Sequence, residues 1–170
     1  MPAQIDLERL YDEHAQALFG LLLNLTRNEA DTRDLLQEVF VKLAQRPGLL
    51  SEVRDERSFL LRLSHNMAID LMRRKNVRQK HYDQIASESF ELFASDAEPD
   101  ERDFRRALSL ALGALPIEQR AVAHLKLWER LTFEQIASLL EIPANTAASR
   151  YRYALDKLRE RLRPIYDEIK

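Results

Sequence analysis

The segment 131–163 constrains the fold most tightly, because its apolar spacing fits two helices that are separated by a short turn. Thr132 and Gln135 form a capping-box pattern at the start of the first helix, and Pro143 restarts the chain after the turn. A basic helix alone favours an ordinary core helix with a solvated face. The capped helix and turn before it instead favour a helix-turn-helix, whose second helix can enter a DNA major groove.

The second helix of this segment carries polar side chains opposite its apolar stripe. Arg152 has the chemistry to bond guanine, and Asn145 has the chemistry to bond adenine or a phosphate. Basic residues beside this face suit phosphate contacts. The residues predicted to face DNA are Asn145, Ser149, Arg150, Arg152, Tyr153 and Lys157.

The rest of the chain is also predicted to be helical. It has only three glycines and lacks strand-like runs of Val, Ile and Thr, so we expect an all-α protein. Apolar residues at steps of three and four predict three helices before about residue 76. We expect two small helical domains, 1–80 and 102–170, joined by an acidic linker at 81–101. The last helix is predicted to end at Pro164.

Charge is distributed unevenly along the chain, although the formal net charge is only -2. Segment 62–80 holds six basic residues and one acid, and segment 144–163 holds six basic residues and two acids. Between them, segment 79–103 carries eight acids and two basic residues. Two basic faces joined by an acidic linker point to nucleic acid more strongly than the total charge does.

Two further clusters each allow two interpretations. The basic residues near 62–75 are either a solvated helix end, favourable to the helix dipole, or a second DNA contact. The acidic residues Asp31, Asp34 and Glu38, with Gln37 among them, are either ordinary acids near a helix N-terminus or a docking surface for a basic partner.

Several classes of protein are not expected. The chain has no cysteine, which excludes disulfides and thiolate metal sites and fits a reducing cytosol. No apolar run approaches 18 residues and the N-terminus has no signal-peptide pattern, so we expect a cytoplasmic protein without membrane insertion. The four histidines lack metal-ligand spacing and no Gly-rich phosphate loop occurs. We therefore expect neither an enzyme nor a cofactor.

Taken together, these segments resemble the two-domain extracytoplasmic-function sigma factors of bacteria. The opening helices resemble sigma region two in LYDEHAQALFGLLLNLTRNEADTRDLLQEVFVKLAQ, where DLLQEVF is the most specific part, and in RSFLLRLSHNMAIDLMRRK. The C-terminal part resembles region four in LPIEQRAVAHLKLWERLTFEQIASLLEIPANTAASRYRYALDKLRERL. The sequence departs from the group at Arg33, which interrupts an often acidic run, and at Glu141, where glycine is frequent.

The resemblance implies roles for particular residues. It implies that the DLLQE-type helix binds core RNA polymerase through Asp31, Asp34, Leu35, Gln37, Glu38 and Phe40. It implies that the next helix faces the melted -10 element of promoter DNA through Arg62, Ser64, His65, Asn66, Asp70, Arg73 and Arg74. It also implies that the helix-turn-helix reads the duplex -35 element.

The resemblance thus implies a sigma factor with core polymerase and promoter DNA as partners, and an anti-sigma factor as a further one. Two other functions stay open from the residues alone. A stand-alone helix-turn-helix regulator needs a dimer surface, and we find no obvious dimerisation helix in the sequence. A helical adaptor that binds only protein would not bind promoter DNA when joined to polymerase.

Overall fold

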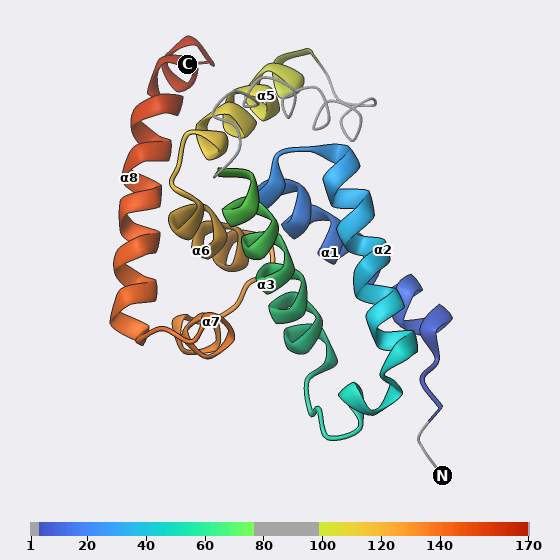
Figure 1. The fold of residues 1–170 in the computed structure, drawn as a ribbon. Helices are drawn as coiled ribbons and strands as arrows, with labels where there is room; N and C mark the ends of the chain where they lie inside the picture. Colours follow the sequence, from blue (N-terminus) through green and yellow to red (C-terminus); the bar gives the residue numbers. More distant parts are fainter. Residues whose placement is uncertain (1–3, 77–98, 170) are drawn as a thin grey trace. The chain divides into compact units, whose positions relative to one another are not determined.

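The computed structural model of the chain describes residues 4–76 and 99–169, which are helical apart from short connections (Figure 1). They belong to two compact units, Met1–Gln79 (unit 1) and Lys80–Lys170 (unit 2). Within the described ranges there is no β-strand, which confirms the all-α prediction. The predicted acidic linker lies outside these ranges, except for its last three residues. No helix in the described ranges is long and apolar enough to cross a membrane.

Unit 1 is a three-helix bundle, coloured blue to green in Figure 1. It contains α1 (Leu7–Thr26), α2 (Glu29–Gln45), the short 3-10 helix η1 (Pro47–Leu50) and α3 (Glu56–Asn76). Each of the three α-helices packs against the other two. Their apolar stripes meet in a core that includes Leu18, Leu21, Leu22, Leu25, Val39, Leu43, Leu60, Leu61 and Ala68.

Polar side chains fix where the helices of unit 1 begin. The first N–H groups of a helix lack an intrahelical acceptor, and an Asp or Asn side chain just before the helix supplies one. The connection between α1 and α2 is short because Arg27 takes a left-handed conformation, with φ of 57°. The capping pairs are Asp6 with Arg9 N–H at 3.0 Å, Asn28 with Asp31 N–H at 2.9 Å, and Asp55 with Ser58 N–H at 3.1 Å.

The described part of unit 2, residues 99–169, contains four helices, coloured yellow to red in Figure 1. The long last helix packs against each of the other three and so organises the unit. Its core consists of Ala111, Leu112, Leu115, Ala123, Ala154 and Leu158, with Leu108 and Leu162 partly buried against it. The helices are α5 (Pro99–Gly113), α6 (Ile117–Leu127), α7 (Phe133–Leu140) and α8 (Ala144–Ile169).

Two helix ends in unit 2 differ from the prediction. Helix α5 begins at Pro99 rather than near residue 102, because a proline fits the first helical position, where its missing N–H costs nothing. Helix α8 does not end at Pro164 but continues to Ile169. A proline inside a helix removes one hydrogen bond. The carbonyl that loses its donor belongs to Glu160, an exposed residue, so water can replace that bond.

Candidate functional site

The helix-turn-helix of unit 2 is formed by α7, a three-residue turn and α8. The Thr132 hydroxyl accepts the Gln135 N–H at 3.1 Å, and the Gln135 amide oxygen accepts the Thr132 N–H at 2.8 Å. This is the capping box that the sequence predicts. At the other end of α7, Glu141 adopts the left-handed conformation (φ 57°), which turns the chain toward α8. The rings of Phe133 and Tyr151 pack edge to face, with centroids 5.6 Å apart, and join the two helices.

The predicted DNA-facing residues of α8 share one side of this helix. Ala147, Ala154 and Leu158 are buried on the side that faces the core. Asn145, Arg152, Tyr153 and Lys157 are exposed, whereas Ser149 and Arg150 are half-buried. The Arg152 guanidinium lies 5.7 Å from the centre of the Tyr153 ring, so a cation–π contact limits its orientations. Unit 2 therefore presents an exposed polar and cationic helix face that fits a major groove.

The predicted -10 residues lie along α3 in unit 1. Asn66, Asp70, Arg73 and Arg74 are exposed, and Arg62 and His65 are half-buried. His65 Nδ1 lies 3.2 Å from Asn66 Oδ1. Burial lowers the pKa of the His65 imidazole, and the cationic Arg73 lowers it further, while the contact with Asn66 opposes the shift. Three basic residues, Arg73, Arg74 and Lys75, lie together in the last turn of α3.

Ser64 is placed differently from the predicted set. Its exposed fraction is 0%, and its hydroxyl finds no hydrogen-bond partner among the described residues. It lies on the core stripe of α3 with Leu61 and Ala68, one turn from each. Ser64 is therefore a core residue in this structure and cannot touch DNA directly.

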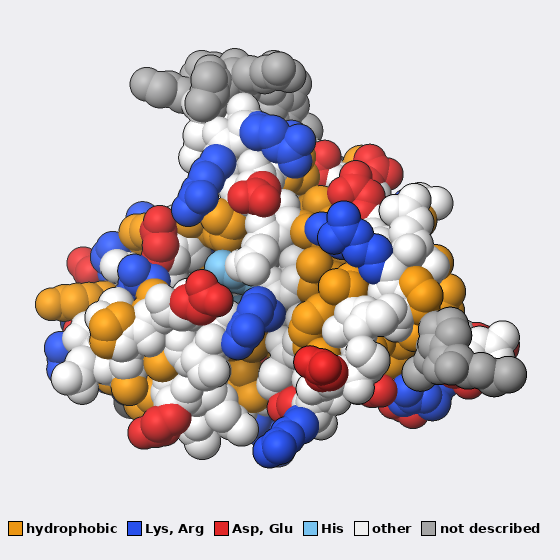
Figure 2. All heavy atoms as spheres, turned by 60° about the horizontal axis from the view of Figure 1, so that its bottom comes forward, with side chains coloured by type: hydrophobic (Ala, Val, Ile, Leu, Met, Phe, Trp, Pro, Cys, Tyr) orange, Lys and Arg blue, Asp and Glu red, His pale blue; other side chains and the backbone are white. Residues whose placement is uncertain are grey.

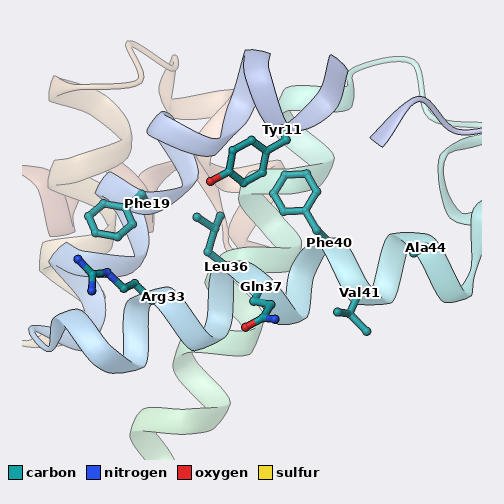
Figure 3. Close-up of a pocket in the computed structure, with 8 residues that line it drawn as sticks. All are labelled: Tyr11, Phe19, Arg33, Leu36, Gln37, Phe40, Val41 and Ala44. Carbon is teal, nitrogen blue, oxygen red and sulfur yellow. The ribbon is translucent and has the colours of Figure 1, made fainter. Parts of the chain in front are cut away.

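Helix α2 presents an open groove to the surface between itself and α1 (Figure 3). Its volume is about 590 Å³. In the close-up, Tyr11 and Phe40 lie together on one side of Leu36, and Phe19 and Arg33 lie on the other. The rings of Tyr11 and Phe40 have centroids 5.2 Å apart. The residues that line the groove are Tyr11, Phe19, Arg33, Leu36, Gln37, Phe40, Val41 and Ala44.

The residues predicted to bind polymerase are distributed around α2. Gln37 and Phe40 line the groove, and the exposed Asp34 and Glu38 lie next to it on the same helix. Leu35 is only 4% exposed and packs in the core, so it supports the helix and does not offer a contact. Asp31 pairs with Lys75 of α3.

Several groove residues were missed by the sequence analysis, notably Tyr11, Val41 and Ala44. The signal was present, because Gln37, Val41 and Ala44 recur at steps of four and three on one face of α2. Val41 is an apolar residue on the polar side of the helix, and it is exposed. An exposed apolar residue that borders an apolar groove indicates a surface that another molecule can bind.

Helix α3 is also tied to its neighbours by ion pairs at both ends. At its start, the Arg9 guanidinium donates to the two Glu56 carboxylate oxygens at 2.9 and 3.2 Å. This contact lowers the pKa of the Glu56 carboxyl. Glu13, His14 and Glu56 bring three possible metal-ligand atoms within 4.8 Å of one another, but both carboxylates already form ion pairs with Arg9. At the other end of α3, Lys75 pairs with Asp31.

Basic, acidic and apolar side chains are interspersed over the face of the molecule shown in Figure 2. This distribution agrees with the small net charge of the chain. Affinity for nucleic acid must therefore come from local clusters, such as the last turn of α3 and the outer side of α8, rather than from the total charge.

Comparison with protein-family models gives two matches, one in each unit. Residues 10–78 match the family described as Sigma-70 region 2, and residues 111–160 match the one described as Sigma-70, region 4. The first range covers the groove and α3, and the second covers the helix-turn-helix.

Curated proteins resemble the chain over nearly its whole length. The ECF RNA polymerase sigma factor SigL of Mycobacterium tuberculosis is 31% identical over 163 residues, which cover 94% of this chain and 90% of SigL. The RNA polymerase sigma factor CarQ of Myxococcus xanthus is 31% identical over 169 residues, which cover 98% of this chain and 95% of CarQ. Among solved structures, the sigma factor RpoE in complex with the anti-sigma factor NepR from Bartonella quintana has a similar fold. Its TM-score is 0.70 at 19% identity, over 93% of this chain and 97% of that chain.

Proposed function

This chain belongs to the extracytoplasmic-function group of RNA polymerase sigma factors, and we propose that three surfaces on its two units contact core polymerase, -10 DNA and -35 DNA. The observation that carries the proposal is that each family match coincides with a surface of suitable chemistry. The region-two match contains the α1–α2 groove and the basic end of α3. The region-four match contains the exposed face of α8.

Core polymerase is proposed to bind at the groove between α1 and α2. An apolar groove with exposed carboxylates beside it suits a helix that has an apolar stripe and basic flanks. Phe40 and Val41 would provide the apolar contact, and Asp34 and Glu38 would select the basic partner.

The -10 element is proposed to bind along α3. Arg73 and Arg74 would neutralise phosphates, while His65 and Asn66 would lie close to an unstacked base. A base outside the duplex exposes edges that pairing hides, which allows a short helix to read it.

The -35 element is proposed to bind α8 in its major groove. Asn145 and Arg152 would face base edges, and Ser149 and Tyr153 lie beside them on the same exposed side. Arg150 and Lys157 would contact phosphates. Each unit alone is expected to bind DNA weakly. Joining both on one polymerase raises the effective concentration of each unit at its own element.

The test is reconstitution of the purified chain with core polymerase from the organism that encodes it. We expect holoenzyme to form and to initiate at promoters that core polymerase alone ignores. Val41→Lys should weaken core binding, whereas Leu110→Lys, at a similarly exposed apolar residue in unit 2, should not. A chain that never associates with core polymerase would overturn the proposal.

The same holoenzyme tests the -35 surface. Arg152→Ala should cost about 1–3 kcal/mol of binding to -35 DNA and relax specificity at one base pair. Arg159→Ala is the matched control, because Arg159 is exposed on the same helix but about 10 Å further along its axis. Equal losses for the two variants would indicate general charge attraction rather than base readout.

Regulation by an anti-sigma factor is also proposed, because the structurally similar RpoE is complexed with the anti-sigma factor NepR. We further propose that the chain acts in the cytoplasm as a non-enzymatic initiation factor, because its binding surfaces serve to position polymerase on DNA. In the proposed function, one copy of the chain binds promoter DNA together with polymerase. A stand-alone helix-turn-helix regulator would instead bind two DNA half-sites as a homodimer. Binding of the free chain to a palindromic site would favour that alternative.

A further inference from the structure

One ion pair joins the two helices of unit 1 that are proposed to bind different partners. Lys75 in the last turn of α3 donates to the Asp31 carboxylate in the first turn of α2. These residues are 44 positions apart in the sequence, so the contact belongs to the tertiary structure. The Asp31 side chain is 20% exposed and the Lys75 side chain is 46% exposed.

Among the described residues, the end of α3 has less apolar packing than its middle. The last fully buried residue of this helix is Ala68. Beyond it, Ile69, Leu71 and Met72 are only half-buried, and residues 73–76 are exposed. The two turns that carry the proposed DNA contacts are therefore held by less apolar packing than the middle of the helix, and a polar tie has more influence there.

Asp31 is well placed for such a tie. Its backbone N–H is capped by the Asn28 side chain at 2.9 Å, which fixes the position of the residue. Its carboxylate lies in the first turn of α2, near the positive end of the helix dipole. At 3.6 residues per turn, Asp31 lies roughly 20° around α2 from Glu38, so the two residues share one side of the helix. Asp31 differs from Asp34 and Glu38 because it is less exposed and its carboxylate is already paired with Lys75.

We infer that Asp31 is a positioning residue, which holds the basic end of α3 in the direction needed for -10 DNA and does not touch polymerase. This inference rests on the proposed function. It reassigns Asp31 from the set of predicted polymerase contacts to a link between the polymerase-binding helix and the DNA-facing helix. When α2 binds polymerase, the Asp31–Lys75 pair would also fix the end of α3 and so orient Arg73 and Arg74.

The experiment is a double-mutant cycle in the reconstituted holoenzyme, with Asp31→Asn, Lys75→Met and the double variant. Core affinity and the rate of open-complex formation at one promoter are measured separately. Each single variant should slow open-complex formation about two- to fivefold, which is the range of a surface ion pair. The double variant should be no slower than the slower single variant, and core affinity should stay within about twofold of wild type.

Two additional variants separate positioning from a loss of folding. Asp31→Lys with Lys75→Glu restores the pair with reversed charges and should recover part of the lost rate. Glu101→Gln breaks an exposed ion pair with Arg105 in unit 2 and should leave the rate unchanged. Far-UV circular dichroism should be the same for all variants.

The outcomes decide between specific alternatives. Loss of core affinity in Asp31→Asn but not in Lys75→Met would overturn the inference and make Asp31 a direct polymerase contact. Additive effects of the two substitutions would also overturn it, because Lys75 would then contact DNA by itself. A wild-type chain that does not bind core polymerase at all would instead refute the proposed function.

Discussion

At the residue scale, the buried hydroxyl of Ser64 gives a direct prediction about the stability of unit 1. Its hydroxyl is shielded from solvent and lacks a hydrogen-bond partner within the described part of the chain. An unsatisfied buried hydroxyl is destabilising, and removal of its oxygen leaves only a small space. Ser64→Ala should therefore leave the stability of unit 1 unchanged or raise it by up to about 1 kcal/mol, as measured by urea unfolding. Promoter binding should not change.

Ser58→Ala is the matched control for this prediction. The Ser58 hydroxyl donates to the Asp55 carboxylate at 2.7 Å, on the same helix, so the same substitution should lower stability there. A Ser64→Ala variant that loses -10 DNA binding while its stability is retained would restore the original assignment of Ser64 as a DNA contact.

His65 makes stability depend on pH in a defined direction. The pKa of its imidazole in the folded chain is lowered, mainly by burial, so it lies below the value of about 6.5 in the unfolded chain. As pH falls below that value, the unfolded chain binds more protons and becomes favoured. The free energy of unfolding should decrease as the pH falls below about 6.5. His65→Gln should flatten this part of the profile in urea titrations, and an unchanged slope would show that another group is responsible.

Single residues also show what the sequence could reveal about the site. Ser64 and Leu35 were assigned to surfaces by position within a resemblance, which carries no information about exposure. Their spacing did carry it, because Ser64 shares the 3.6-residue stripe of Leu61 and Ala68. The Asp31–Lys75 pair and the contribution of α1 to the groove could not be predicted, because both depend on how separate helices pack together.

At the element scale, the turn of the helix-turn-helix contains a correctable strain. Glu141 holds a left-handed conformation, which costs a residue with a side chain about 1–2 kcal/mol. Glycine adopts this conformation freely but loses more entropy on folding, by about 0.5–1 kcal/mol. Glu141→Gly should therefore raise the stability of unit 2 by about 0.5–1 kcal/mol, measured by thermal or urea unfolding.

Glu134, at the opposite end of α7, provides a matched control for this prediction. It is an exposed glutamate in the first turn of α7 with helical geometry, so Glu134→Gly should lower stability by about 0.5–1 kcal/mol. If both glycine variants were destabilised equally, the conformation of Glu141 would not be a source of strain.

The helices themselves were predictable because their signals are local. The capping box of Thr132 and Gln135 marks where α7 begins, and the structure confirms this start. Asn28 and Asp55 cap α2 and α3 by similar local hydrogen bonds. The end of α8 was not predictable in the same way. Pro164 reads as a stop signal in the sequence, yet the helix continues through it, and the carbonyl that loses its hydrogen bond belongs to an exposed residue that water can reach.

At the scale of the whole molecule, the two units have separate apolar cores. The change from basic to acidic composition around residue 80 predicted two domains, whereas most of the predicted linker at 81–101 lies outside the described residues. Domains of this size bury only about 60% of their unfolded surface, so each unit is expected to be marginally stable.

The chain offers an internal reporter for this independence, because its only tryptophan, Trp128, lies in unit 2. Trp128 stacks on His124, with ring centroids 5.3 Å apart, and is 46% exposed, so unfolding of unit 2 should change its fluorescence. Far-UV circular dichroism reports on the helices of both units. If the units unfold separately, the two probes should give transitions that do not coincide.

A pair of core substitutions makes this prediction decisive. Leu22→Ala in unit 1 removes a fully buried side chain and should cost about 2–5 kcal/mol. It should shift only part of the circular dichroism transition and leave the Trp128 fluorescence midpoint in urea unchanged. Leu112→Ala, equally buried in unit 2, should move the fluorescence midpoint. If the fluorescence midpoint fell equally in both variants, the two units would unfold as one cooperative block. The two units could then not be treated as independent DNA-binding domains.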